Sequence, residues 1–219
     1  MSTPTRPPKR RTVRIVICGA LAVLVALMVA NTRFLTADEA QAITPAAFNA
    51  ADFAKEAFPE IVDDVTKNAT DLTEVVTAVT ADPTAAGQEY GHLAGTDKYA
   101  IPVKLTGLVS AADANFLTIV FDGLPAGVSV RIPVAQAING TALRDVTGQI
   151  KFADFTDQTD YQQVANELKT VATTEVIGSV DVASLLNKQI TVDGVYVTNS
   201  GPVGTFVVTP VTIEIETGA

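Results

Sequence analysis

The sequence predicts an α+β protein: an N-terminal membrane-anchor helix and a helical leader, followed by a five-stranded antiparallel β-barrel with a helix between strands 3 and 4. An uninterrupted apolar run of sixteen residues follows a basic head. Apolar residues then recur three or four positions apart, and from Tyr99 they alternate with polar ones, which is the period of a strand. The predicted segments are a cytoplasmic basic segment (1–14), a transmembrane signal anchor (15–35), a tether (36–44), the helical leader (45–98) and the barrel domain (99–217).

The basic head determines the predicted orientation. No acidic residue occurs before Asp38, and the head contains five cationic residues: Arg6, Lys9, Arg10, Arg11 and Arg14. Positive charge beside an apolar segment stays in the cytoplasm. We therefore expect a single pass through the inner membrane over residues 15–35, with the C-terminal domain outside the cytoplasm.

The apolar run has two other interpretations. A helix over Ile15 to Ala30 rises roughly 24 Å, short of a ~30 Å hydrocarbon core unless Asn31 to Leu35 join it. A cleaved signal peptide remains open, although the candidate site Ala40-Gln41-Ala42 lies twelve residues beyond Ala30. Lipidation is disfavoured because Cys18 lies at the start of the run rather than at its end.

Composition excludes several function classes. After residue 35 the chain has nine basic and 24 acidic residues, a net charge of −15, which repels phosphate backbones. We therefore expect no nucleic-acid partner. Cys18 is the only cysteine and His92 the only histidine, so neither a disulfide nor a multi-histidine metal site can form within the chain. The sequence predicts no cofactor and no metal.

Three helices are predicted in the leader. They are expected to begin at Thr44-Pro45, at Asp71 and at Asp82-Pro83, the last ending at Gly91. Pro59 should kink or break the first of them. Glu74, three residues after Asp71, is typical of a capping box.

Five strands follow, with a helix predicted over about residues 160–177. The strands are expected at 99–106, 116–121, 128–132, 190–197 and 205–215. Gly107 and Gly194 interrupt the alternation as bulges would, and Pro210 indicates that the last strand is an edge or bends there. This order is typical of an oligonucleotide/oligosaccharide-binding (OB) barrel, in which glycine permits a shared strand to bend. An α+β sandwich is the alternative.

Several stretches resemble one bacterial family. They are Ala81-Asp82-Pro83, Gly140 to Asp145, Phe152 to Gln158, Val164-Ala165-Asn166 and Val208 to Val211. Together they are similar to the predicted periplasmic lipoproteins grouped as domain of unknown function 2291, over about residues 45–217. The resemblance implies an exported, membrane-tethered protein with an OB-like barrel, often encoded near sugar-type ABC transporters. The chain departs from that family because no cysteine follows its apolar run.

The candidate ligand-binding residues lie between the third strand and the helix. They are Arg131, Thr141, Arg144, Asp145, Asp154, Asp157 and Gln158. Arginines beside carboxylates and amides suit a sugar or a carboxylate ligand. The structural interpretation is favoured, in which Arg144 links the connection to the barrel and Asp157 caps the helix. Asp154, Asp157 and Asp160 lack the spacing and the glycine of a calcium loop.

No catalytic motif is present, so we do not expect an enzyme. The sequence favours an extracytoplasmic accessory domain of unknown biochemistry that binds a sugar-like solute or a component of a sugar-type ABC transporter. The alternative is an envelope structural or assembly protein that acts only through protein–protein contacts.

Overall fold

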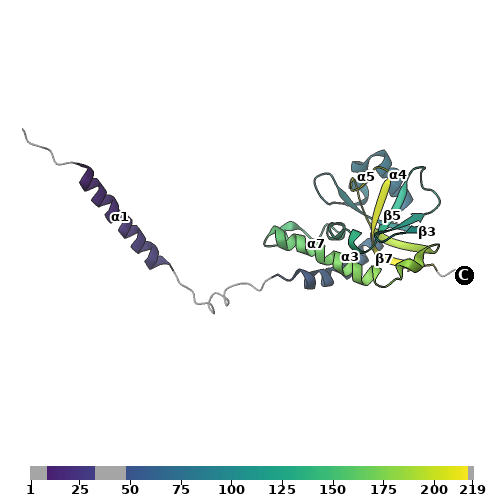
Figure 1. Ribbon diagram of the computed structural model, residues 1–219. Helices are drawn as coiled ribbons and strands as arrows, with labels where there is room; N and C mark the ends of the chain where they lie inside the picture. Colours follow the sequence, from purple (N-terminus) through teal and green to yellow (C-terminus); the bar gives the residue numbers. More distant parts are fainter. Residues whose placement is uncertain (1–8, 33–47, 217–219) are drawn as a thin grey trace, which may run out of the picture. The chain divides into compact units, whose positions relative to one another are not determined.

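The computed structural model describes residues 9–32 and 48–216, which belong to two separate units (Figure 1). The first contains helix α1, Lys9–Asn31, whose residues from Ile15 onward are all exposed. In the parts of the chain that the structure describes, no helix combines the length and the apolar character needed to cross a membrane. The transmembrane anchor predicted over residues 15–35 is therefore not confirmed. The tether predicted over residues 36–44 lies outside the described residues.

Three helices open the second unit: α3 (Ala50–Asn68), α4 (Leu72–Ala81) and α5 (Pro83–Tyr90). The predicted start at Thr44-Pro45 lies outside the described residues, and α3 begins after an Asn49 cap. The starts at Asp71 and Asp82 are confirmed. As N-caps, Asp71 accepts one backbone N–H and Asp82 accepts two. Glu74 accepts a hydrogen bond from the Tyr90 hydroxyl (2.9 Å).

The predicted break at Pro59 is wrong, since α3 runs through it. Pro59 lies on the exposed face, where water can satisfy the carbonyl that loses its partner. On the opposite face, Phe58 and Ile61 are 3% and 2% exposed. Burial of these side chains on both sides of the proline keeps the helix continuous, because it outweighs the loss of one backbone hydrogen bond.

The five long strands close into a barrel. They are β3 (Tyr99–Ala112), β4 (Phe116–Val120), β5 (Ser129–Pro133), β6 (Gln189–Val197) and β7 (Thr205–Ile215), paired in the order β3-β4-β5-β7-β6 with β6 returning to β3. The two-residue strands β1 (Thr70–Asp71) and β2 (His92–Leu93) pair with β3. The OB-like barrel is thus confirmed.

The barrel is mixed rather than wholly antiparallel, which corrects the prediction. β7 runs parallel to β5 and antiparallel to β6. The reason is topological: β7 fills the gap between the third and fourth barrel strands, so closure fixes its direction. Pro210 therefore does not mark an edge; it is buried opposite Gly194, where the register shifts. The bulge at Gly194 is confirmed, whereas the irregularity of β3 lies at Val109/Ala111 rather than at Gly107.

Two helices fill the connection between β5 and β6. They are α6 (Gly140–Asp145) and α7 (Gln158–Ala172), the latter extended by the π-helical turn η3 (Thr173–Ile177). The helix predicted over about residues 160–177 is therefore confirmed. α7 lies alongside α3, as Figure 1 shows. Leader and barrel share one hydrophobic core, to which α3 contributes Val65, α4 Leu72 and the barrel Ile101.

Candidate ligand-binding site

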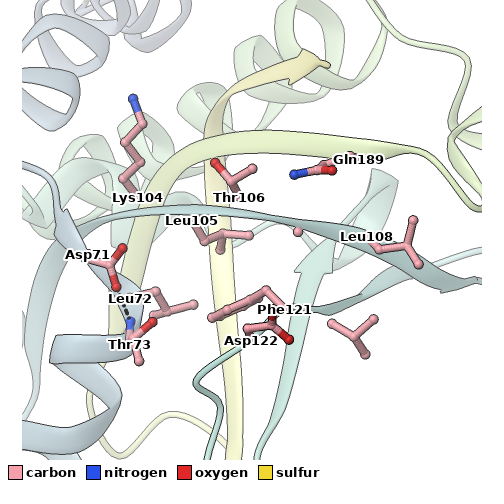
Figure 2. A pocket seen from close by; sticks show the side chains of 12 residues that line it. Asp71, Leu72, Thr73, Lys104, Leu105, Thr106, Leu108, Phe121, Asp122 and Gln189 are labelled. Carbon is pink, nitrogen blue, oxygen red and sulfur yellow. Dashed lines mark hydrogen bonds between the residues drawn. The ribbon is translucent and has the colours of Figure 1, made fainter. Parts of the chain in front are cut away.

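A cavity of about 570 Å³ lies beside the middle of β3 (Figure 2). Its polar lining comes from four separate segments of the chain. These residues are Asp71, Thr73, Lys104, Thr106, Asp122 and Gln189. Leu108 and Phe121 add apolar surface. The volume lies within the ~300–1,000 Å³ typical of small-molecule sites, so the cavity is large enough for a small ligand.

Strand pairing fixes one end of the cavity. β1 runs parallel to β3 and places Asp71 opposite Lys104. α4 starts at the next residue, and the Asp71 carboxylate caps it by accepting the Thr73 N–H at 2.8 Å. Figure 2 shows Asp71, Leu72 and Thr73 gathered at this end, below Lys104. Asp71 and Lys104 are therefore neighbours across the β1–β3 pairing, at the first turn of α4.

Gly107 allows β3 to lie close to the end of β4 at the other wall of the cavity. A Cβ at Gly107 would lie 2.6 Å from Ile119 Cγ2 and 2.9 Å from the Val120 carbonyl oxygen. Only glycine permits β3 to pass the end of β4 at this distance. The chain leaving β4 then carries Phe121 and Asp122 to the side of the cavity opposite Thr106 (Figure 2).

Two polar side chains of the cavity keep donors and acceptors that no described residue occupies. Thr106 Oγ1 shares a hydrogen bond of 2.7 Å with Thr191 Oγ1. The side chains of Asp122 and Gln189 form no hydrogen bond with any residue that the structure describes. Carboxylates accept, an ammonium donates and an amide does both, so the set can serve hydroxyl groups, which also do both. The half-buried Phe121 ring offers a flat apolar surface.

Lys104 forms an ion pair with Asp193, its partner on the neighbouring strand β6. Their closest charged atoms, Lys104 Nζ and Asp193 Oδ1, are 3.8 Å apart, and the side chains are 54% and 8% exposed. Asp193 Oδ2 accepts a hydrogen bond from Thr212 at 3.0 Å. The Lys104 ammonium is thus paired with the Asp193 carboxylate, and Lys104 also lines the cavity.

Arg144 and Asp145, predicted as ligand-binding residues, form a closed cluster instead with Tyr161. Arg144 donates from Nε to Asp145 Oδ1 at 2.7 Å and from Nη2 to Oδ2 at 3.1 Å. Its guanidinium carbon lies 3.6 Å from the centre of the Tyr161 ring, and Nη1 donates to the Tyr161 carbonyl. Burial, with Asp145 next in importance, raises the pKa of Tyr161. This arrangement favours the structural interpretation, because it ties α6 to α7.

Arg131 lies elsewhere, on the outer face of the barrel. Its guanidinium lies 3.9 Å from the centre of the Phe116 ring on β4, and Nη2 donates to Asp113 Oδ2 at 3.3 Å. Backbone N–H groups of Asn115 and Phe116, with a smaller contribution from Arg131, lower the pKa of Asp113. This is a second pairing of an arginine with an aromatic ring, and it is more exposed than that of Arg144 with Tyr161.

The remaining predicted residues act as local hydrogen-bonding groups. Thr141 donates to the Asn139 side chain, and Asp154 accepts the Lys151 N–H in the 3₁₀ turn η2 (Phe152–Asp154). Asp157 caps α7, and Gln158 is its exposed first residue. The structure brings Arg144 and Asp145 together but does not gather the seven residues into one cavity, and none of them lines the cavity in Figure 2. Among the described residues, no group of histidine, cysteine or carboxylate side chains is placed to hold a metal ion.

Sequence reasoning missed the cavity. The sequence predicts Asp71 as a helix start, while Lys104 and Thr106 are alternating positions in a predicted strand. Nothing local distinguishes these residues from ordinary surface residues. Their convergence follows from barrel closure and from the β1–β3 pairing, which joins residues more than 30 positions apart.

The fold defines the class of the protein: an OB-type barrel preceded by packed helices. The family model described as "Predicted periplasmic lipoprotein (DUF2291)" matches residues 21–214, so the chain belongs to this family. The resemblance read from the sequence is thereby confirmed. The matched region begins after Cys18, the only cysteine.

A solved structure supports the fold. The chain is similar to an OB-fold protein from Thermotoga maritima, with a TM-score of 0.63 and 17% identity, over 78% of this chain and 99% of that one. At this identity the likeness shows the fold alone. The search of the curated proteins found no match to the chain.

Proposed function

We propose that this protein is a non-catalytic, extracytoplasmic binding domain whose cavity beside β3 takes a neutral, polyhydroxylated solute such as a sugar. The observation that carries the proposal is the composition of the cavity: Asp122 and Gln189 have free hydrogen-bonding capacity beside Thr106, Lys104 and the Phe121 ring. Polar groups that converge around a partly apolar cavity of this size are the usual form of a small-molecule site.

Charge favours a neutral ligand. Asp71 and Asp122 outnumber Lys104 in the lining, and the chain after residue 35 carries a net charge of −15. Both repel an anionic solute such as a sugar phosphate. A hydroxyl-rich neutral molecule meets no such repulsion and can donate to the carboxylates while accepting from the ammonium. The family description "periplasmic" supports a location where such solutes pass.

Attachment at a membrane is the second part of the proposal. The exposed residues of α1 include many large apolar side chains, among them Ile15, Leu21 and Met28 at 69%, 53% and 62% exposure. Water disfavours so much apolar surface. The cell membrane is therefore the proposed location, with the barrel on its outer side, and a component of a sugar-type ABC transporter is the proposed partner. An alkaline phosphatase fused to the C-terminus should be active; activity only of a cytosolic reporter would contradict this location.

A thermal-shift experiment tests the ligand. The full-length protein, in a mild neutral detergent, is titrated with a panel of neutral mono- and disaccharides. A ligand at 100 times its Kd stabilises the folded state by about 2.7 kcal/mol, which raises the Tm of a domain of this size by roughly 5–10 °C. Asp122→Asn and Gln189→Ala should weaken the response.

The matched control is Asp97→Asn, which removes an exposed carboxylate outside the cavity. It should respond to the sugar as the unaltered protein does. If no sugar in the panel raises the Tm, or if the Tm rises equally in Asp122→Asn and in the unaltered protein, the cavity is not the binding site.

A further inference from the structure

A second, smaller groove of about 330 Å³ lies between α3 and the segment around η2. Its apolar side is formed by Phe53, Ile150 and Phe155, and its polar side includes Glu56, Glu60 and Asp154. None of these residues belongs to the cavity beside β3. The groove therefore requires its own explanation.

The aromatic wall is held in place by its neighbours. The rings of Phe53 and Phe155 meet edge to face, with centroids 5.6 Å apart. Phe48 packs on both rings, and Phe155 also packs on Tyr161 at 5.4 Å, within the buried Arg144 cluster. Rings fixed in this way present a preformed surface to a partner, so little ordering accompanies binding.

The acidic side of the groove has no cationic partner among the residues that the structure describes. Glu56 and Glu60 lie four positions apart on α3 and hence on one face of the helix, where like charges repel. Within the part of the chain that the structure describes, neither they nor Asp154 form an ion pair. A cation bound among these carboxylates would relieve the repulsion.

At two other places in this chain, an aromatic ring and a carboxylate together bind an arginine side chain. Arg144 lies over Tyr161 while paired with Asp145, and Arg131 lies over Phe116 while paired with Asp113. In both places the ring faces a guanidinium, which stacks on aromatic faces and binds carboxylates with its planar edge. The groove offers both of these groups without an arginine.

We propose that this groove docks a basic segment of a partner protein and receives one arginine side chain, stacked on the Phe155 ring and paired with Glu56 and Glu60. The net charge of −15 beyond residue 35 steers such a partner toward the domain. The same charge repels an anionic lipid surface, and three carboxylates at the groove make a lipid headgroup the weaker occupant. This interaction is independent of the sugar site.

The probe is an acetylated and amidated Gly-Arg-Gly peptide, titrated into the full-length protein in neutral detergent and followed by calorimetry. Its partner peptide contains citrulline, which keeps the shape of arginine and lacks its charge. We expect the arginine peptide to bind at least tenfold more tightly than the citrulline peptide. Phe155→Leu should weaken binding severalfold, because the leucine side chain is apolar but has no aromatic face.

Charge removal needs a matched control. Glu56→Gln/Glu60→Gln should weaken the arginine peptide at least tenfold, whereas Glu89→Gln/Asp97→Asn removes two exposed carboxylates outside the groove and should leave the affinity within twofold. Both double variants should keep the response to sugar. Equal binding of the two peptides, or equal losses in the two double variants, would overturn the proposal. So would displacement of the arginine peptide by soluble phosphocholine, a zwitterionic lipid headgroup, which would assign the groove to lipid.

Discussion

At the scale of single residues, the charged groups of this domain are held in two ways. Asp145 is matched to Arg144 by two short hydrogen bonds. Asp193, by contrast, is 6% exposed, and its Oδ1 has no hydrogen-bond partner among the described residues. A buried carboxylate oxygen without a donor is costly, and the Lys104 ammonium at 3.8 Å offsets that cost only in part. The first pair gives rigidity, whereas the second is a longer contact in which one carboxylate oxygen has no donor among the described residues.

Replacing Arg144 tests the rigid pair. Arg144→Ala leaves the Asp145 carboxylate buried without its cation and removes the stacking on Tyr161. We expect the free energy of unfolding to fall by about 3–4 kcal/mol, measured by urea denaturation, with the Kd for sugar unchanged. Arg144→Lys keeps the charge but loses the planar fork, so it should recover less than half of the loss. A nearly unchanged stability together with weaker sugar binding would instead make Arg144 a ligand-binding residue.

At the scale of elements, the sequence predicts the features that depend on a local pattern of residues. The five strands, the helix before β6 and the bulge at Gly194 follow from alternation, from apolar spacing and from a glycine that breaks the alternation. Local patterns do not predict the parallel pairing of β5 with β7, because barrel closure determines it. Nor do they predict the continuity of α3 through Pro59, which depends on burial against distant residues. The cavity was missed for the same reason, since Asp71 and Gln189 meet only in the closed barrel.

The bulge at Gly194 gives a prediction for the whole of β6. A Cβ there would lie 2.5 Å from the Thr209 carbonyl oxygen, which is backbone and cannot move aside as a side chain could. Gly194→Ala should therefore force β6 and β7 apart and lower the free energy of unfolding by about 2–3 kcal/mol. Gly201→Ala is the control, because its nearest atom is 3.8 Å away. It should change stability by less than about 0.5 kcal/mol. Equal effects in the two variants would mean that the bulge does not require glycine.

At the scale of the whole molecule, the helical leader and the barrel behave as one body. α3, α4 and the barrel strands contribute to a single core over residues 48–216. β1, the short strand between α3 and α4, contributes Asp71 to the cavity beside β3. Removing the leader would thus expose the core and also open the proposed binding site. Stability and ligand binding are linked through the same contacts.

The core also makes global stability depend on alkaline pH. Tyr196 lies on β6, 6% exposed, with its ring centroid 4.8 Å from that of Phe206, and burial raises its pKa to about 12. Below pH ~10 the hydroxyl is protonated in both the folded and the unfolded chain, so its contribution is fully present. Between pH ~10 and 12 only the unfolded chain loses the proton, and the stability falls as the pH approaches the folded pKa.

The loss attributable to Tyr196 should reach about 2 kcal/mol at pH 12, after a discount for partial contact with solvent. Urea denaturation at pH 8, 10, 11 and 12 measures it by comparing the unaltered protein with Tyr196→Phe. The phenylalanine variant keeps the ring stacking and lacks the titrating group, so its stability should decline less steeply. Tyr161 and Tyr90 also have raised pKa values and contribute equally to both proteins, so the difference between the curves isolates Tyr196. Parallel curves would show that the Tyr196 hydroxyl titrates as it does in the unfolded chain, and that the barrel interior at β6 is open to water.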